Sequence, residues 1–159
     1  MTYMDKTFGA GITAPDSATT TQQSGREALV LVIEDDAGLS SALRNICECL
    51  NVFVERMSSR DELGPALYRR RPMAVVAQMD GVGQDGCHVL MTVAAHDRDL
   101  PVLLITGDDA SLLGAADAVE EMWGLSSVDK WPRLLGVGEV VDFLFRAGHK
   151  GGCLRLIST

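Results

Sequence analysis

Residues able to bind a metal ion or contact a phosphoryl group follow three apolar segments of the chain. The segments cover residues 29–33, 73–77 and 101–105. The polar residues that follow them are the acidic run Glu34-Asp35-Asp36, the amide Gln78 and the hydroxyl residue Thr106. Carboxylate oxygens are the ligands that Mg²⁺ prefers, and a hydroxyl group can hydrogen-bond a phosphoryl oxygen. The carboxyl ends of parallel strands meet at one edge of an open α/β sheet, so these residues are expected to form one site.

The spacing of apolar residues predicts the sheet that would position these groups. Strands are expected at residues 29–33, 52–57, 74–78, 102–106 and 126–130. Helices are expected to begin near residues 37, 60, 86, 109 and 137, the last one ending at residue 147. Pro65 lies inside the second helix and should bend or delay it. Strands that alternate with helices predict an α/β fold, with a doubly wound parallel sheet of order 2-1-3-4-5 in a three-layer α/β/α arrangement.

From residue 27 to residue 147, this succession of segments resembles the receiver domain of two-component response regulators, which has a flavodoxin-like fold. The resemblance implies an acidic pair that holds Mg²⁺ and an aspartate, after the third strand, that accepts a phosphoryl group. It also implies a Thr or Ser and a Lys that contact the phosphoryl oxygens. The acidic pair corresponds to Glu34 and Asp35, and the hydroxyl residue corresponds to Thr106.

The phosphoacceptor position falls on Gln78, counted back from Asp85-Gly86, which matches an Asp-Gly of the family. An amide is neutral and a poor nucleophile, and it cannot form the mixed anhydride that an aspartyl phosphate is. It also removes one negative charge from the metal cluster, which weakens cation binding. Gln78 is then either a residue that holds Thr106 or an acidic side chain by hydrogen bonds, or an idle buried polar group. We expect no catalytic residue, and Mg²⁺ binding at Glu34 and Asp35 that is weak or absent.

Two further residues keep phosphoryl transfer open as an alternative. Asp80 lies two residues beyond Gln78, so in an extended backbone its side chain points to the same side. Lys130 lies one residue before the family lysine position, which falls on Trp131. Lys130 either reaches the site or points away and leaves Trp131 to cover it. The aromatic switch position of the fifth strand falls on Val128.

Length and composition set the class of protein. The 159 residues suit one domain, which we expect at 27–147, with a disordered or loosely docked leader at 1–26 and a tail at 148–159. The net charge of −8 argues against a nucleic-acid surface. The sequence shows no signal segment and no long apolar run, so we expect a cytoplasmic protein without a membrane contact. The four cysteines are too sparse and too irregularly spaced for a disulfide framework or a zinc site.

These observations favour a stand-alone, atypical receiver in phosphorelay signalling, a pseudo-receiver that is not an enzyme. It would act as a phosphorylation-independent interaction module. Its partner would be a histidine kinase, another regulator, an output protein or a second copy of the chain. The alternative is a working receiver that uses a relocated acceptor such as Asp80. A flavin or nucleotide binder on the same fold is disfavoured, because the acidic run from Glu34 would repel a phosphate group.

Two more expectations follow from the resemblance. The surface formed by the fourth helix, the fifth strand and the fifth helix is the usual contact surface of the family. Its expected apolar and acidic residues are Ala110, Leu112, Leu113, Trp123 and Val128, with Asp117, Glu120 and Glu121. The peptide bond between Trp131 and Pro132 is expected to be cis, since receivers commonly have a cis bond at the corresponding Lys-Pro.

Overall fold

A computed structural model describes residues 25–34, 37–57, 60–78, 86–108 and 110–152. The side chains of Arg60, Gly86, Ala110 and Leu112 lie outside that description. Asp80, the acceptor in the alternative interpretation, and the metal-ligand candidate Asp35 also fall outside it, as do most of the predicted leader and tail.

Five parallel strands form one sheet, as the apolar segments predicted. They are β2 (Glu27–Ile33), β3 (Phe53–Met57), β4 (Pro72–Gln78), β5 (Val102–Ile105) and β6 (Val128–Trp131). Their order in the sheet is β3-β2-β4-β5-β6, and every neighbouring pair is parallel. Numbered along the chain this is the order 2-1-3-4-5, so the predicted topology is confirmed.

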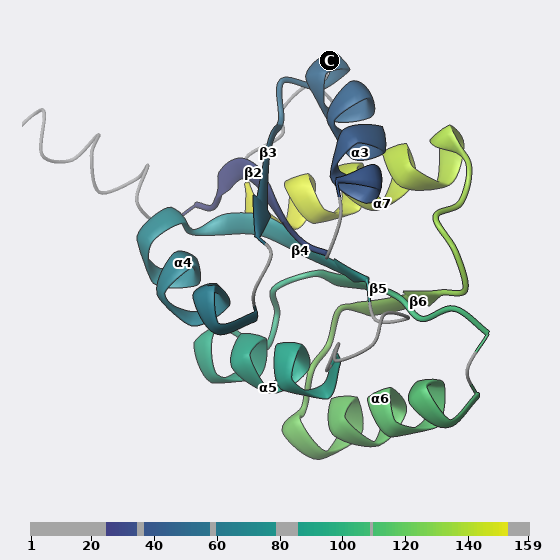
Figure 1. The fold of residues 1–159 in the computed structure, drawn as a ribbon. Coiled ribbons are helices and arrows are strands. Elements are labelled where there is room, and N and C mark those ends of the chain that lie inside the picture. Colours follow the sequence, from purple (N-terminus) through teal and green to yellow (C-terminus); the bar gives the residue numbers. More distant parts are fainter. Residues whose placement is uncertain (1–24, 35–36, 58–59, 79–85, 109, 153–159) are drawn as a thin grey trace, which may run out of the picture.

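Helices cover both faces of the sheet (Figure 1). They are α3 (Gly38–Cys49), α4 (Leu63–Arg70), α5 (Gly86–His96), α6 (Ala110–Trp123) and α7 (Val137–Gly151), with a short 3₁₀ helix η2 (Arg60–Glu62) before α4. Helices α3 and α7 lie on one face, and α4, α5 and α6 lie on the other. The doubly wound, three-layer architecture is therefore confirmed.

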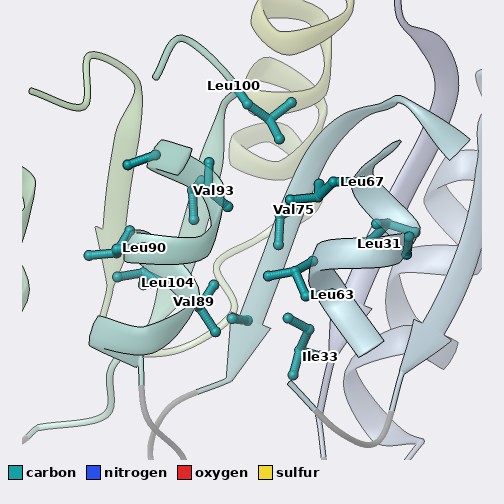
Figure 2. Packing of buried hydrophobic residues seen from close by; sticks show 14 of the residues in the cluster. Leu31, Ile33, Leu63, Leu67, Val75, Val89, Leu90, Val93, Leu100 and Leu104 are labelled. Atoms are coloured by element: carbon teal, nitrogen blue, oxygen red, sulfur yellow. The ribbon is translucent and has the colours of Figure 1, made fainter. Parts of the chain in front are cut away.

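Each face of the sheet has its own apolar core. On one face, alternate residues of the central strands pack against α4 and α5, and Leu31, Val75 and Leu104 are fully buried there (Figure 2). The intervening residues, such as Val32 and Val76, pack against α3 and α7 on the other face. Burial on both faces explains why the strands read as continuous apolar runs in the sequence.

The start of α4 and the end of α7 were both addressed by the sequence analysis, one correctly and one not. Pro65 delays the second helix as predicted, because α4 begins only at Leu63 after the 3₁₀ turn, and Pro65 sits in the first turn where its missing N–H is tolerated. Helix α7 continues beyond the expected end at Ala147 to Gly151. Gly152 follows as the C-cap residue, and its positive φ of 73° suits a residue without a Cβ.

Candidate functional site

The register of the sheet brings the predicted polar residues to one edge. Ile33 pairs with Ala77, and Gln78 pairs with Ile105, so the chain segments that begin at Glu34, Gln78 and Thr106 leave the sheet side by side. This is the carboxyl-end edge of the central strands β2, β4 and β5. Glu34, Gln78 and Thr106 therefore lie at the same edge of the sheet, and their joint role as one site stays a prediction.

Glu34 is fully buried and binds the amino-terminal end of α3. Its Oε1 accepts a hydrogen bond of 2.8 Å from the backbone N–H of Leu39, and its Oε2 accepts one of 2.7 Å from the N–H of Ser40. The first backbone N–H groups of a helix have no partner within the helix, and they carry partial positive charge. A carboxylate placed there satisfies two donors and is stabilised in its charged form.

This capping role was not expected from the sequence. The residue at the N-cap position of α3 is Ala37, which makes no side-chain cap hydrogen bond. Glu34 precedes the helix by four residues, beyond the usual spacing of an N-cap side chain. Its long side chain reaches forward from the strand end to the N–H groups, a spacing that the short capping motifs do not include.

Arg56 of the neighbouring strand β3 is the second partner of Glu34. Its Nε lies 3.7 Å from Oε2 of Glu34, and its Nη2 donates a hydrogen bond of 3.4 Å to the backbone carbonyl oxygen of Glu34. The side chain of Arg56 is partly exposed, while that of Glu34 is not. A guanidinium and a helix terminus therefore offset the charge that Glu34 carries inside the protein.

This arrangement does not fit Glu34 as a direct magnesium ligand. Both carboxylate oxygens already bind helix N–H groups and the side chain is fully buried, whereas a bound Mg²⁺ usually keeps several water molecules. Among the described residues, no three His, Cys, Asp or Glu side chains are grouped closely enough to hold a metal ion. The other predicted ligand, Asp35, lies outside the description.

Gln78 is the last residue of β4 and is half-buried. Alternation along β4 places it on the same face as Val76, the face that α3 and α7 cover. It lies beside Ile105 and one strand away from Glu34, and it is the residue on which the sequence resemblance placed the phosphoacceptor position. The side chain there carries no charge at neutral pH and offers an amide instead of a carboxylate.

Thr106 is buried, and its hydroxyl group lies within reach of backbone carbonyl groups. Oγ1 is 3.2 Å from the carbonyl oxygen of Gly107 and 3.3 Å from that of Trp131, and the one hydroxyl proton can serve only one of them at a time. The backbone N–H of Thr106 also donates to the carbonyl of Trp131, at 2.8 Å. Thr106 thus ties the end of β5 to the end of β6.

Lys130 lies on the face of the sheet that α6 covers. Its Nζ forms ion pairs with Asp117, at 2.8 Å, and with Glu120, both on α6. Partial burial acts to lower the pKa of Lys130, but the hydrogen bonds and charges of the two carboxylates raise it above its ordinary value. Of the two orientations left open for Lys130, the structure shows the one directed away from the other site residues.

Trp131, the next residue, lies on the opposite face. Its ring packs edge-on against Phe143 of α7, with the ring centroids 6.4 Å apart. It therefore belongs to the core under α7. The Trp131–Pro132 peptide bond is trans, since the described chain contains no cis peptide bond, and the expectation of a cis bond is wrong. Val128, at the aromatic switch position, is half-buried against the core beneath α5 and α6.

The expected contact surface is divided by the structure. Leu113 is partly exposed on α6, and Asp117 and Glu120 on the same helix point to Lys130 of β6. Trp123 lies elsewhere, in an apolar groove of about 360 Å³ that α4 and α5 also line. The side chains of Ala110 and Leu112 lie outside the described part of the chain. Trp123 thus belongs to the α5 side of α6, not to the β6 side.

Comparison with known proteins gives the same fold. No protein-family model matches the chain. Over 78 residues the chain is 36% identical to the C4-dicarboxylate transport transcriptional regulatory protein DctD of Pseudomonas aeruginosa. That match covers 49% of this chain but only 17% of DctD, so the chain corresponds to a small part of its relative.

Solved structures of receiver domains superpose over most of the chain. The signal receiver domain of an HD domain-containing protein from Pseudomonas fluorescens matches with a TM-score of 0.63 at 16% identity, covering 80% of this chain and 98% of that one. The beryllofluoride-activated NtrC4 receiver domain dimer matches with a TM-score of 0.62 at 17% identity, covering 77% and 98%. An N-terminal receiver domain from Bacteroides fragilis matches with a TM-score of 0.57 at 23% identity, covering 75% and 94%.

Within its described residues, the chain has no helix long and apolar enough to cross a membrane. The strand order, the helices on both faces and the similarity to these solved structures agree with one another. The described part of the chain has the flavodoxin-like fold of response-regulator receiver domains.

Proposed function

We propose that this chain is an atypical receiver in two-component signalling, which binds a protein partner without being phosphorylated on aspartate. The observation that carries the proposal is Gln78 at the carboxyl end of β4, beside β5 and one strand from Glu34. A phosphoacceptor needs an anionic oxygen nucleophile, and the amide of Gln78 has none. The fold that would support phosphoryl transfer is present, but the nucleophile at its usual position is absent.

The neighbouring groups support the proposal, because their contacts are made within the protein. Glu34 caps α3 and pairs with Arg56, and Lys130 pairs with two carboxylates of α6. In the family pattern an acidic residue and a lysine at these positions would serve a metal ion and a phosphoryl group. Here they stabilise the unphosphorylated chain. We therefore expect Mg²⁺ binding to be weak or absent, and the chain to have no enzymatic activity of its own.

The partner is expected to be a protein: a histidine kinase, another regulator or an output protein. A module that is not phosphorylated must present a contact surface that is already formed without phosphorylation, since no phosphoryl group shifts it between two states. Its effect on signalling would then depend on its concentration or on the state of its partner.

The direct test is acetyl phosphate with Mg²⁺, followed by intact mass measurement. We expect no mass increase of one phosphoryl group above trace level. The matched variant is Gln78→Asp, which restores the carboxylate. A labile phosphoryl group on this variant would show that the carboxylate is all that the parent lacks for phosphorylation. Phosphorylation of the parent chain would contradict the proposal. If that phosphorylation were also lost in Asp80→Asn, the relocated acceptor would be identified.

A further inference from the structure

A pocket lies at the edge of the sheet opposite to the one that carries Gln78. It has a volume of about 380 Å³ and opens where β2 and β4 begin and where α4, α5 and α7 end. Pro72 and Gln78 are the two ends of β4, so at a rise of about 3.3 Å per residue the pocket is about 20 Å from the candidate site. Its lining residues are Gly25, Arg26, Tyr68, Arg71, Pro72, His96, Asp97, Lys150 and Gly151.

The pocket is positively charged although the chain as a whole is acidic. Arg26, Arg71 and Lys150 line it together with a single carboxylate, that of Asp97. Three positive charges and one negative charge leave a local charge of +2, with His96 counted as neutral, in a chain whose net charge is −8. A concave site lined by one sign of charge raises the local concentration of ligands with the opposite sign.

The ends of three helices meet here, and their terminal carbonyl groups would ordinarily repel an anion. Three backbone carbonyls that border this pocket are already bonded within the protein. The carbonyl of Gly151 accepts a hydrogen bond of 2.9 Å from the backbone N–H of Arg26, and that of Arg71 accepts one of 2.8 Å from the N–H of Glu27. The carbonyl of Gly25 accepts a bond from the Arg71 side chain. The positive side chains are therefore not matched by exposed carbonyls at these three residues.

Two side-chain nitrogens at the pocket lack a partner within the described chain. Nη2 of Arg26 donates to Asp97 at 2.7 Å, but its Nη1 is buried without a hydrogen-bond partner. The same holds for Nδ1 of His96, the neighbour of Asp97. A buried donor without a partner costs free energy, and a ligand that accepts its hydrogen bond removes that cost. Lys150 adds an ammonium group with three donors, one of which is directed to Ser127.

We propose that this pocket binds a small molecule through a doubly charged oxyanion, a phosphate group. The planar guanidinium groups of Arg26 and Arg71 suit such a group, because their paired N–H donors match its oxygens. The charge of a phosphate dianion also equals the local excess of positive charge. The volume of the pocket is at the lower end of the range for small-molecule sites.

The test is a titration of the ¹⁵N-labelled chain with sodium phosphate, with the ionic strength kept constant by sodium chloride. We expect saturable amide shifts that are confined to the lining residues. Arg71→Gln and Lys150→Gln should each weaken binding at least fivefold. Arg44→Gln removes one positive charge from an exposed position on α3 and should leave the affinity within twofold. Lys150 is exposed, so its variant remains informative if Arg71→Gln fails to fold.

His96 provides a separate readout. The pKa of His96 lies below its ordinary value. Burial has the largest effect and lowers the pKa, the charge of Asp97 raises it, and the charge of Arg26 lowers it. Arg71, Lys150 and Tyr68 are the other ionisable groups that line the pocket. A bound phosphate adds negative charge, so the pKa of His96, followed by its imidazole resonances, should rise when phosphate is present.

Parallel titrations with sulfate and with succinate identify the ligand chemistry. Binding of phosphate and sulfate, with succinate at least tenfold weaker, is the expected result. Equal or tighter binding of succinate would show that the pocket prefers carboxylates to phosphate and would overturn the proposal. Shifts that do not saturate, or that Arg44→Gln reduces as much as Lys150→Gln, would show general ionic screening and would also overturn it. None of these results depends on whether Gln78 accepts a phosphoryl group.

Discussion

The chemistry of the candidate site is decided by individual atoms at the end of β4 and its neighbours. Gln78 carries an amide on a side chain one methylene longer than that of an aspartate, so the position has neither the charge nor the nucleophile of a carboxylate. Glu34 keeps its carboxylate, but each of its oxygens binds a helix N–H group. A residue type that suggests metal binding in the sequence thus has a structural function in the fold.

The first prediction concerns the cap formed by Glu34. In Glu34→Gln, one carboxylate oxygen becomes an NH₂ group, so one of the two N–H groups of Leu39 and Ser40 loses its acceptor. The charge that interacts with the helix terminus and with Arg56 is lost as well. We expect the free energy of unfolding to fall by about 1–2 kcal/mol, measured by urea denaturation.

Glu48→Gln is the matched control for this variant. Glu48 is an exposed residue at the other end of α3, and the same chemical change there should alter stability by less than about 0.5 kcal/mol. Equal stability of the Glu34→Gln variant and the parent would show that the cap contributes nothing.

At the scale of the helices and strands, the sequence predicted most of the architecture. The strands were recognisable because both faces of the sheet are covered, which requires runs such as 29–33 and 102–105 to be apolar throughout. The strand order followed from the alternation of strands and helices, since the handedness of crossover connections allows few topologies. The position of Glu34, Gln78 and Thr106 at one edge of the sheet follows from that order alone.

The directions of side chains at the strand ends could not be predicted in the same way. A shift of one residue along a strand moves a side chain to the other face, so a one-residue uncertainty in β6 left Lys130 either at the site or away from it. The two carboxylates of α6 that hold Lys130 lie ten and thirteen residues earlier, and no motif links them to it. The capping of α3 by Glu34 and its pairing with Arg56 depend on tertiary contacts of the same kind.

The carboxyl end of α7 provides the second prediction. Gly152 closes the helix with a φ of 73° and has open space around the position of a Cβ atom. Gly152→Ala therefore adds no steric contact, and its cost arises from the left-handed backbone conformation. We expect the variant to be destabilised by about 1 kcal/mol in thermal or urea unfolding.

Gly114→Ala gives the opposite sign and serves as the control. Gly114 lies within α6, is exposed, and also has open space at its Cβ position, but its φ is not positive. Alanine there should stabilise the protein by about 0.5–1 kcal/mol, since glycine is the poorer helix former. A stabilising effect at Gly152 would contradict the assigned backbone conformation.

For the whole molecule, the distribution of exposed apolar side chains bears on how it meets a partner. Among the described side chains, the exposed large apolar residues of α6 and of the start of α7 are Leu113, Met122, Trp123 and Val137, and Trp123 lies in the groove that α4 and α5 also line. Acidic side chains lie beside them, but Asp117 and Glu120 hold Lys130, so reversing the charge of Glu120 would break a contact inside the protein. Glu121 is exposed and is the better residue for a change of charge.

The last prediction is self-association through the surface formed by α6, β6 and the start of α7, without any need for phosphorylation. Exposed apolar side chains beside charged ones favour specific association. Sedimentation velocity over a range of concentrations should show a dimer that beryllofluoride with Mg²⁺ does not change. Leu113→Asp and Glu121→Lys should each shift the equilibrium toward monomer, with an unchanged circular dichroism spectrum.

Met91→Asp is the matched control, because Met91 on α5 is 40% exposed and Leu113 is 39% exposed. The Met91→Asp variant should associate like the parent. Two results would contradict the prediction. A monomer at all concentrations would show that this surface does not associate, and a dimer formed only with beryllofluoride would show that association depends on a phosphoryl group.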